Sequence, residues 1–211
     1  PIVADMVDIA AVNANFDGIS YAKGASVLHQ LTAYVGRENF IKALQTYFKK
    51  HAFKNTTMND LFIEFEAASG RDLKPWTSTW LQTAGVNTLR ANFSIDNGKY
   101  SSFAIEQSAP HIPVGSKELR LHKLAVGLFD VVDGQLKKRA SFDAEIDGAS
   151  TSLPSLVGQS AADLVLINDK DLTYSKLRLD RTSIETLKSY LSSFADDLNR
   201  TVCWGAIWDM H

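Results

Sequence analysis

The chain has 211 residues, of which 45% are hydrophobic and 22% are charged, and its formal net charge at pH 7 is −2. This composition is typical of a globular protein with a buried core and excludes disordered and collagen-like chains. A charge so close to zero offers no basic field for counterion release, so we expect no nucleic-acid partner. No apolar run approaches the roughly 20 residues that cross a bilayer, so we expect no membrane segment.

The two ends of the sequence predict an internal piece of a longer polypeptide. Pro1 is not an initiator methionine and no secretory leader follows it, while the last helical pattern stops at His211 without a terminator. The remainder of the same polypeptide is then the first expected partner. A single cysteine, Cys203, cannot form an internal disulfide, and with the missing leader this predicts a cytoplasmic protein.

Residues 20–85 carry apolar side chains at helical spacing, and a glycine closes each run. The first helix is expected from Tyr21 to Val35, with Ser20 as its N-cap and Gly36 at its end. The apolar stripe of the second helix consists of Phe40, Ile41, Leu44, Tyr47 and Phe48.

Two more helices are expected in this block. The third ends at Gly70, and its apolar face consists of Leu61, Phe62 and Phe65. The fourth has Pro75 in its first turn, where proline is tolerated, and ends at Gly85. Its apolar face consists of Trp76, Trp80, Leu81 and Ala84.

At Asn87 the apolar period changes from 3.6 to two, which predicts strands. Three dipeptides favour hairpin turns: Asn97-Gly98, Asp133-Gly134 and Asp147-Gly148. The alternation between Leu119 and Phe129 indicates strands with one buried face. We interpret residues 88–180 as a small antiparallel β-sandwich.

The helical period returns after Arg181, where Thr182 or Ser183 is the expected cap. One stripe consists of Ile184, Leu187, Leu191 and Phe194, and residues 197–211 predict a further helix. The predicted fold class is an α+β multidomain chain with a helical part over residues 1–87, the sandwich over 88–180 and the start of a helical domain over 181–211.

Within this chain the sequence offers no familiar catalytic or metal motif. None of the five histidines lies four residues from another, and His29 precedes Gln30 rather than a glutamate, so HExxH is absent and no metal site is expected. There is no G-x-S-x-G elbow or glycine-rich phosphate loop. Cys203 lies between Val202 and Trp204, which favours a buried thiol over a reactive one. The expected role of the tryptophans is core and interface packing: Trp76, Trp80, Trp204 and Trp208.

Residues 18–31, GISYAKGASVLHQL, resemble the catalytic-tyrosine motif of the aminopeptidase N family of zinc metallopeptidases. The motif reads roughly G-I-x-Y-x-K-G-x-x-V-L, and every specified position matches: Gly18, Ile19, Tyr21, Lys23, Gly24, Val27 and Leu28. Residues 75–89 resemble the helix that closes the family's thermolysin-like domain, with Asn87 where many members have proline. Residues 164–180 and 203–210 resemble its last sandwich strands and the start of its helical C-terminal domain.

This resemblance covers nearly the whole chain and implies a zinc-dependent enzyme that removes N-terminal residues from peptides. In the family, the zinc ligands precede the tyrosine, and they are not in this chain. Zinc is therefore expected in the parent enzyme and not in these residues, which should be inactive alone. The alternative is a noncatalytic helical and β-sandwich module that binds a protein partner.

The resemblance assigns Tyr21 as the catalytic residue, whose phenol donates a hydrogen bond to the oxyanion of the transition state. From its local pattern alone, Tyr21 is equally an amphipathic aromatic residue at a helix start. Lys23 is expected to make a structural ion pair or hydrogen bond, and Asp17 to favour the helix N-terminus.

The last helix should expose apolar side chains around most of its circumference: Val202, Trp204, Ile207 and Trp208. Exposed apolar area promotes association. We expect either self-association through this helix or its folding back onto the sandwich.

Overall fold

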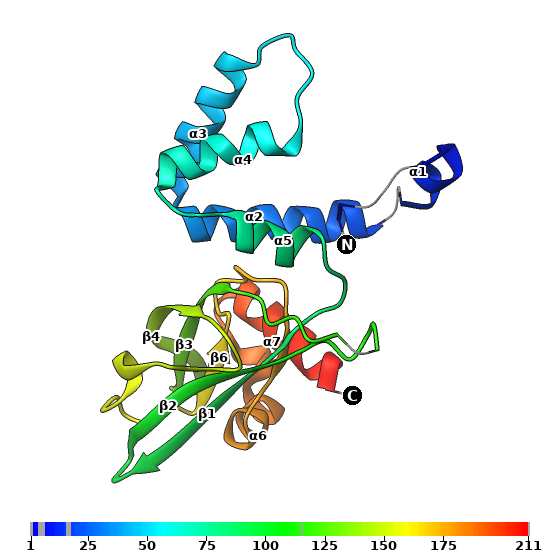
Figure 1. Cartoon of the computed structure of the whole chain (residues 1–211). Coiled ribbons are helices and arrows are strands. Elements are labelled where there is room, and N and C mark those ends of the chain that lie inside the picture. The colour runs from blue at the N-terminus through cyan, green and yellow to red at the C-terminus, as the bar shows by residue number, and fades with distance from the viewer. Residues whose placement is uncertain (1, 4–6, 16–17, 115, 211) are drawn as a thin grey trace. The chain divides into compact units, whose positions relative to one another are not determined.

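The computed structural model describes residues 2–3, 7–15, 18–114 and 116–210. These form two compact units, Pro1–Thr83 and Ala84–His211. The first is helical and the second contains two sheets followed by helices (Figure 1). The predicted α+β fold class is confirmed, while the three predicted domain limits stay a prediction.

The helices of the first unit pack mainly as two neighbouring pairs, α2 with α5 and α3 with α4 (Figure 1). Aromatic and leucine side chains fill the space between them: Leu31, Phe65, Leu73, Trp76 and Trp80 are almost completely buried. In chain order the elements are α1 (Ile9–Asn15), a π-helical turn η1 (Ile19–Lys23), α2 (Gly24–Val35), α3 (Arg37–Lys50), α4 (Met58–Ser69) and α5 (Lys74–Leu81).

A glycine in the left-handed conformation was expected at the C-terminus of three helices, and one of the three is found. Gly70 ends α4 in the left-handed conformation, at φ +70° and ψ +10°, as predicted. Gly36 follows α2 with a positive φ, but its ψ of 137° lies outside that region. The prediction for Gly85 was wrong, because α5 already ends at Leu81. Gly85 is needed for another reason: a Cβ there would lie 2.4 Å from the carbonyl oxygen of Ile112.

Two other helix details differ from expectation. Ser20 is not an N-cap, because the π turn places it inside a continuous helical stretch. The apolar stripe proposed for α3 leaves Ile41 and Phe48 exposed, and the residue that α3 buries is Ala43. Phe40 of the same stripe does pack as expected, since its ring stacks on Phe65 of α4 with centroids 4.9 Å apart.

The second unit is a sandwich of two sheets that share one core. The four-stranded sheet has the order β5-β2-β1-β7, from Ser150–Ser152, Lys99–Ser108, Thr88–Asp96 and Lys176–Arg178. The three-stranded sheet has the order β4-β3-β6, from Gln135–Ile146, His122–Val132 and Leu164–Ile167. One pairing departs from the antiparallel prediction, since β1 and β7 run parallel.

Two of the three predicted hairpins are present. Asn97-Gly98 joins β1 to β2 and Asp133-Gly134 joins β3 to β4, with positive φ at both positions of each turn. Asp147-Gly148 was wrongly assigned to a hairpin, because it carries the chain from β4 in one sheet to β5 in the other.

The expected one-sided burial around β3 is also wrong. Every residue from Leu124 to Phe129 is buried, because β3 is the central strand of its sheet and is covered on both faces. Phe129 makes an edge-to-face contact with Phe194, which lies nearer the C-terminus of the same unit, and their ring centroids are 5.4 Å apart.

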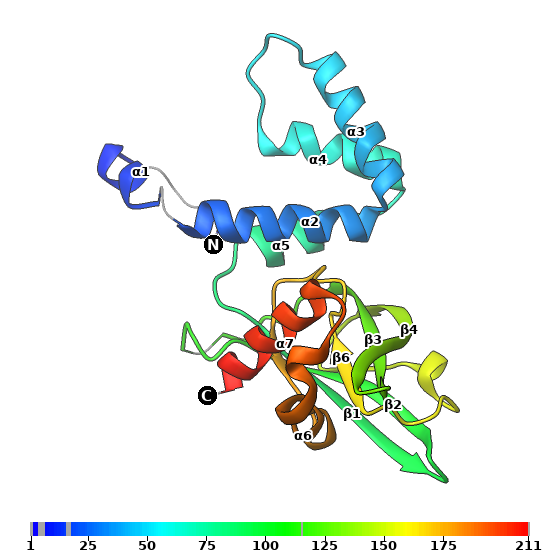
Figure 2. The same ribbon diagram turned by 180° about the vertical axis from the view of Figure 1, so that it is seen from behind.

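The chain ends in α6 (Arg181–Tyr190), the 3-10 turn η3 (Leu191–Ser193) and α7 (Asp197–Met210), which lie on the same side of the sandwich (Figure 2). The cap of α6 is Asp180, whose carboxylate accepts from the Ser183 amide at 3.1 Å, rather than Thr182 or Ser183. Apolar side chains of these helices belong to the sandwich core: Leu187, Phe194, Cys203 and Ala206. The predicted folding of the last helix onto the sandwich is thus confirmed. The expected exposure of Val202 and Ile207 is wrong, because both are partly buried against this core. No helix in the described ranges is both long and apolar enough to cross a membrane.

Candidate functional site

Tyr21 lies at the centre of the π turn Ile19–Lys23 and is 64% exposed. A π turn widens the helical backbone locally, and such turns occur frequently at functional sites. The structure therefore presents the phenol of Tyr21 outward from an unusual stretch of helix. Asp17, which was expected to favour the helix N-terminus, lies outside the described residues.

Lys23 occupies the opposite side of the same turn and is 6% exposed. Its Nζ donates a hydrogen bond to the carbonyl oxygen of Thr83 at 3.1 Å, just beyond the end of α5. An ammonium group is favourable beside the carbonyls at a helix C-terminus. The structural role expected for Lys23 is confirmed, and its effect is to fasten the turn that carries Tyr21.

Beside Tyr21 is a cavity of about 460 Å³, which we call the Tyr21 pocket. Its apolar wall comes from α2, α4 and α5 and includes Val27, Leu28, Leu31, Met58, Leu61, Phe62 and Trp76. Ser20 and Tyr21 contribute hydroxyl groups at one side. A mostly apolar cavity with a few polar groups is the usual form of a small-molecule or peptide side-chain site.

Trp76 contributes a buried aromatic ring to the wall of the Tyr21 pocket. Its ring stacks on Tyr34 with centroids 6.4 Å apart and is almost completely buried. The indole Nε1 has no hydrogen-bond acceptor among the residues that the structure describes. A buried N–H without an acceptor is costly, so the packing of the Trp76 ring has to offset this cost.

A zinc ion does not fit the residues present. In the described part of the chain, no three histidine, cysteine, aspartate or glutamate side chains lie close enough together to hold a metal ion. His29 is exposed on α2 and its neighbour Gln30 is buried, so they share no ligand face. No chemical step can therefore be routed through a metal held by these residues.

Among the described residues, His122 is the most buried histidine, and it lies on β3 of the sandwich. Its Nδ1 lies 2.7 Å from Thr173 Oγ1 and its Nε2 lies 3.1 Å from Gln107 Oε1. Burial lowers the pKa of His122 to about 3, with a further contribution from the positive charge of Arg120. The ring is neutral at physiological pH and its role is structural.

Cys203 is fully buried in α7, which confirms the expectation from its apolar neighbours. Burial raises the pKa of its thiol to about 12, so almost none of it is thiolate at neutral pH. A thiol in this state is not a nucleophile.

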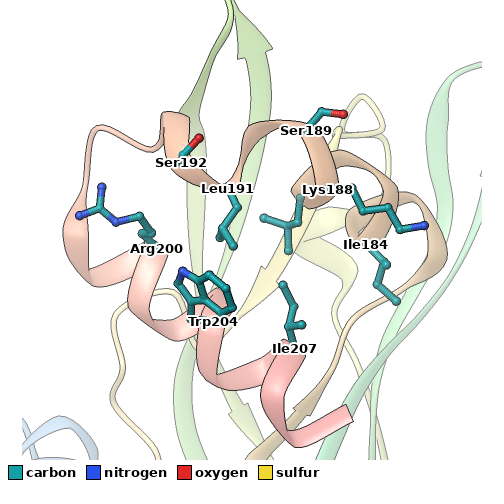
Figure 3. A pocket seen from close by; sticks show the side chains of 9 residues that line it. Ile184, Lys188, Ser189, Leu191, Ser192, Arg200, Trp204 and Ile207 are labelled. Atoms are coloured by element: carbon teal, nitrogen blue, oxygen red, sulfur yellow. The ribbon is translucent and has the colours of Figure 1, made fainter. Parts of the chain in front are cut away.

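A second cavity, of about 630 Å³, lies between α6, η3 and α7 (Figure 3). Trp204 and Ile207 point from α7 toward Leu191 on the other wall (Figure 3). Of the core and interface packing expected for the tryptophans, the core role is confirmed for Trp76 and Trp80. Trp204 is 56% and Trp208 is 78% exposed, so an interface role for these two stays a prediction.

We compared the sequence and fold of the chain with those of known proteins. Residues 1–80 match the Peptidase family M1 domain. Aminopeptidase N of Streptomyces lividans is 47% identical over 215 residues, covering 100% of this chain and 25% of that protein. The chain belongs to peptidase family M1. The M1 assignment agrees with the resemblance carried by the tyrosine motif.

Other relatives of this M1 chain also align with it over most of its length. Leucyl aminopeptidase of Saccharolobus solfataricus is 28% identical and covers 99% of the chain and 24% of its own length. A crystal structure of Legionella pneumophila aminopeptidase A in complex with aspartic acid has a TM-score of 0.70 at 18% identity, covering 94% of this chain and 22% of that one, which shows a shared fold. The chain thus spans about a quarter of the length of these relatives.

The sequence identified Tyr21 but not the pocket beside it. Helical spacing carried part of that signal, since Leu28 follows Tyr21 by seven residues and Leu31 follows Val27 by four. Nothing in the sequence indicated the walls that α4 and α5 contribute, because tertiary packing decides which helices face α2.

Proposed function

We propose that this chain is part of an M1 aminopeptidase that hydrolyses N-terminal residues from peptides, with Tyr21 as the donor to the oxyanion. The observation that carries the proposal is the position of Tyr21. It is exposed on a π turn beside an apolar pocket, and Lys23 of the same turn is hydrogen-bonded to the Thr83 carbonyl oxygen. Relatives named as aminopeptidases support the reaction class.

In peptide hydrolysis, the oxygen of water adds to the carbonyl carbon, the C–N bond breaks, and the amine leaves with a proton. Between these events the carbonyl oxygen bears negative charge. A phenol O–H placed at that oxygen donates a hydrogen bond that is stronger in the transition state than in the ground state, and only such interactions accelerate the reaction. The 64% exposure of Tyr21 suits this role.

The apolar walls of the Tyr21 pocket suit a peptide with a hydrophobic side chain near the bond that breaks. Neither these walls nor the phenol of Tyr21 supplies a nucleophile or a base, so these residues bind and stabilise without completing a catalytic site.

Zinc is part of the proposal as a cofactor of the longer protein. When bound, it would activate water and polarise the carbonyl group. Since the described residues do not form a metal site, the proposal places its ligands in the remainder of the polypeptide. The 211-residue chain alone should therefore hydrolyse no peptide.

A reporter assay tests this function. The longer protein should hydrolyse leucine p-nitroanilide and should not hydrolyse the N-acetylated reporter, because an aminopeptidase requires a free amino group. The 211-residue chain should hydrolyse neither. Activity of the purified 211-residue chain would contradict the placement of the metal site. A longer protein inactive on every free aminoacyl reporter would instead support a noncatalytic interaction module.

A further inference from the structure

The outer face of the four-stranded sheet carries a row of polar side chains that crosses every strand. In register, Arg178 of β7 is beside Arg90 of β1, Arg90 is opposite Glu106 of β2, and Glu106 is opposite Ser150 of β5. The residues that alternate with this row are buried in the sandwich core: Leu89, Ile105 and Leu177. Because successive side chains point to opposite faces, the row faces outward.

These residues border a cavity of about 420 Å³, which we call the sheet-face pocket. Besides the row, its lining includes Thr88, Ser108 and His111. All of these residues belong to the sandwich unit. The pocket is thus separate from the Tyr21 pocket and is not part of the proposed peptidase function.

Among the described residues, the only carboxylate in the pocket lining is Glu106, and it is already bound. Glu106 accepts hydrogen bonds from Arg90 through Nε at 3.2 Å and through Nη2, and from Asn92 Nδ2 at 2.6 Å. The hydrogen bond from Arg90, followed by that from Asn92, lowers the pKa of this carboxyl group. Glu106 therefore neutralises Arg90 and leaves the second arginine uncompensated.

Arg178 has no carboxylate partner in the described part of the chain. Its Nη1 donates to the carbonyl oxygen of Asp209 at 2.7 Å, near the end of α7, and contacts the Leu177 carbonyl oxygen at 3.4 Å. Its Nε and Nη2 have no acceptor among the described residues. A guanidinium group only donates hydrogen bonds, so the occupant that suits it is an acceptor with negative charge.

Three hydroxyl groups line the pocket near the arginines, from Thr88, Ser108 and Ser150. Their oxygens make no hydrogen bond to another described residue. Each can donate to an oxyanion, and the sheet holds their backbones in fixed register. The pocket thus combines one uncompensated positive charge with several free donors.

We propose that the sheet-face pocket binds a small multivalent oxyanion, with Arg178 as its main charged contact and the hydroxyls of Thr88, Ser108 and Ser150 as further donors. The shared chemistry of the ligand is a cluster of negatively charged oxygens, supplied by phosphate groups or by carboxylates. Arg90, paired with Glu106, also lines the site.

Isothermal titration of the 211-residue chain tests the proposal, with inorganic pyrophosphate as the phosphate probe and citrate as the carboxylate probe. Saturable binding of at least one probe is expected at one site per chain. Tighter binding of pyrophosphate would identify phosphate as the preferred chemistry, and tighter binding of citrate would identify carboxylate.

Matched variants separate this pocket from general attraction of anions. Arg178→Gln should weaken binding about tenfold or more, because it removes a charge-assisted donor. Lys99→Gln removes an exposed charge at the far end of β2, outside the pocket lining, and should change binding less than twofold.

Because Arg178 also contacts the end of α7, a second variant leaves that contact intact. Thr88→Val removes one hydroxyl with little change of shape and should weaken binding severalfold. Absence of saturable binding to both probes would overturn the proposal. Equal weakening by Lys99→Gln and Arg178→Gln would also overturn it, because it would indicate unspecific attraction to the surface.

Discussion

The Lys23 ammonium and the Thr83 carbonyl oxygen are joined by a hydrogen bond of 3.1 Å across 60 positions of sequence. The bond connects the π turn below Tyr21 to the segment that follows α5. A buried charge bonded to a main-chain carbonyl fixes the position of the turn, since an ammonium without acceptors would be expelled toward solvent. The backbone that carries the exposed Tyr21 phenol is therefore held in position.

Replacing Lys23 by methionine keeps most of the chain length of the side chain and removes its charge. The free energy of unfolding should fall by roughly 1–3 kcal/mol, because the Thr83 carbonyl loses a charged donor. Urea denaturation of the 211-residue chain measures this change. Lys42→Met, at an exposed position of α3, is the control and should leave the value within about 0.5 kcal/mol. Equal effects of the two variants would contradict the anchoring role.

The buried His122 predicts a loss of stability in acid. Gln107 donates from Nε2 to the carbonyl oxygens of Arg120 and Gly148, so its Oε1 faces His122 and accepts from Nε2–H of the neutral ring. The folded-state pKa is about 3, whereas an unfolded histidine has a pKa of about 6.5. Between these values the unfolded chain binds a proton that the folded chain does not.

The contribution of His122 is thus complete above about pH 6.5 and is lost as the pH falls toward 3, by up to about 1.4 kcal/mol per pH unit. Urea denaturation from pH 7.5 to 4 measures the slope. His122→Gln should reduce it, whereas His29→Gln, at an exposed position of α2, should not. An unchanged slope in His122→Gln would show that His122 is protonated in the folded chain.

Cys203 should resist thiol reagents in the folded chain. Its pKa of about 12 lies some three units above that of a free thiol, which reduces the thiolate fraction on the order of 10³-fold, and burial limits access further. Reaction with Ellman's reagent at pH 8 should be slow in buffer and rapid in urea. Because the chain has a single cysteine, the denatured chain is its own control. Rapid labelling of the native chain would contradict the packing of α7.

The exposed tryptophans of α7 lead us to propose that the 211-residue chain self-associates through this helix. Trp204 and Trp208 place large apolar surfaces in solvent, and such surfaces favour association. Sedimentation velocity should show concentration-dependent association that the double variant Trp204→Lys, Trp208→Lys abolishes. Val114→Lys, an exposed loop position in the same unit, should leave it unchanged. A monomer at all concentrations would refute the proposal.

Local sequence signals predicted the elements that local interactions form. The left-handed cap at Gly70 and the turns Asn97-Gly98 and Asp133-Gly134 depend on the conformational freedom of the residues themselves. Asp147-Gly148 contains the same kind of dipeptide, but its outcome differs because β5 pairs with β2 and not with β4. That pairing is a long-range choice that a turn motif does not encode.

The same distinction between local and long-range interactions applies to the residues around the candidate site and the sandwich. The spacing of the motif identified Tyr21 and suggested a structural Lys23, but the π turn was missed because nothing in the local pattern distinguishes it from an α-helical turn. Asn87 illustrates the long-range part: it bonds the carbonyls of Ser108 and Glu118, and its Oδ1 accepts from buried Arg120 at 2.6 Å. These partners are known only once the sandwich is assembled.

The most direct test of the central claim is the steady-state kinetics of Tyr21→Phe in the longer protein that carries this chain. The variant keeps the ring and removes only the hydroxyl, so fold and zinc content should be unchanged by circular dichroism and metal analysis. The account predicts that kcat for leucine p-nitroanilide falls on the order of 10²- to 10³-fold with a smaller change in KM, because the hydrogen bond is made chiefly in the transition state. A folded, metal-loaded variant that retains near-normal kcat would contradict the role assigned to Tyr21.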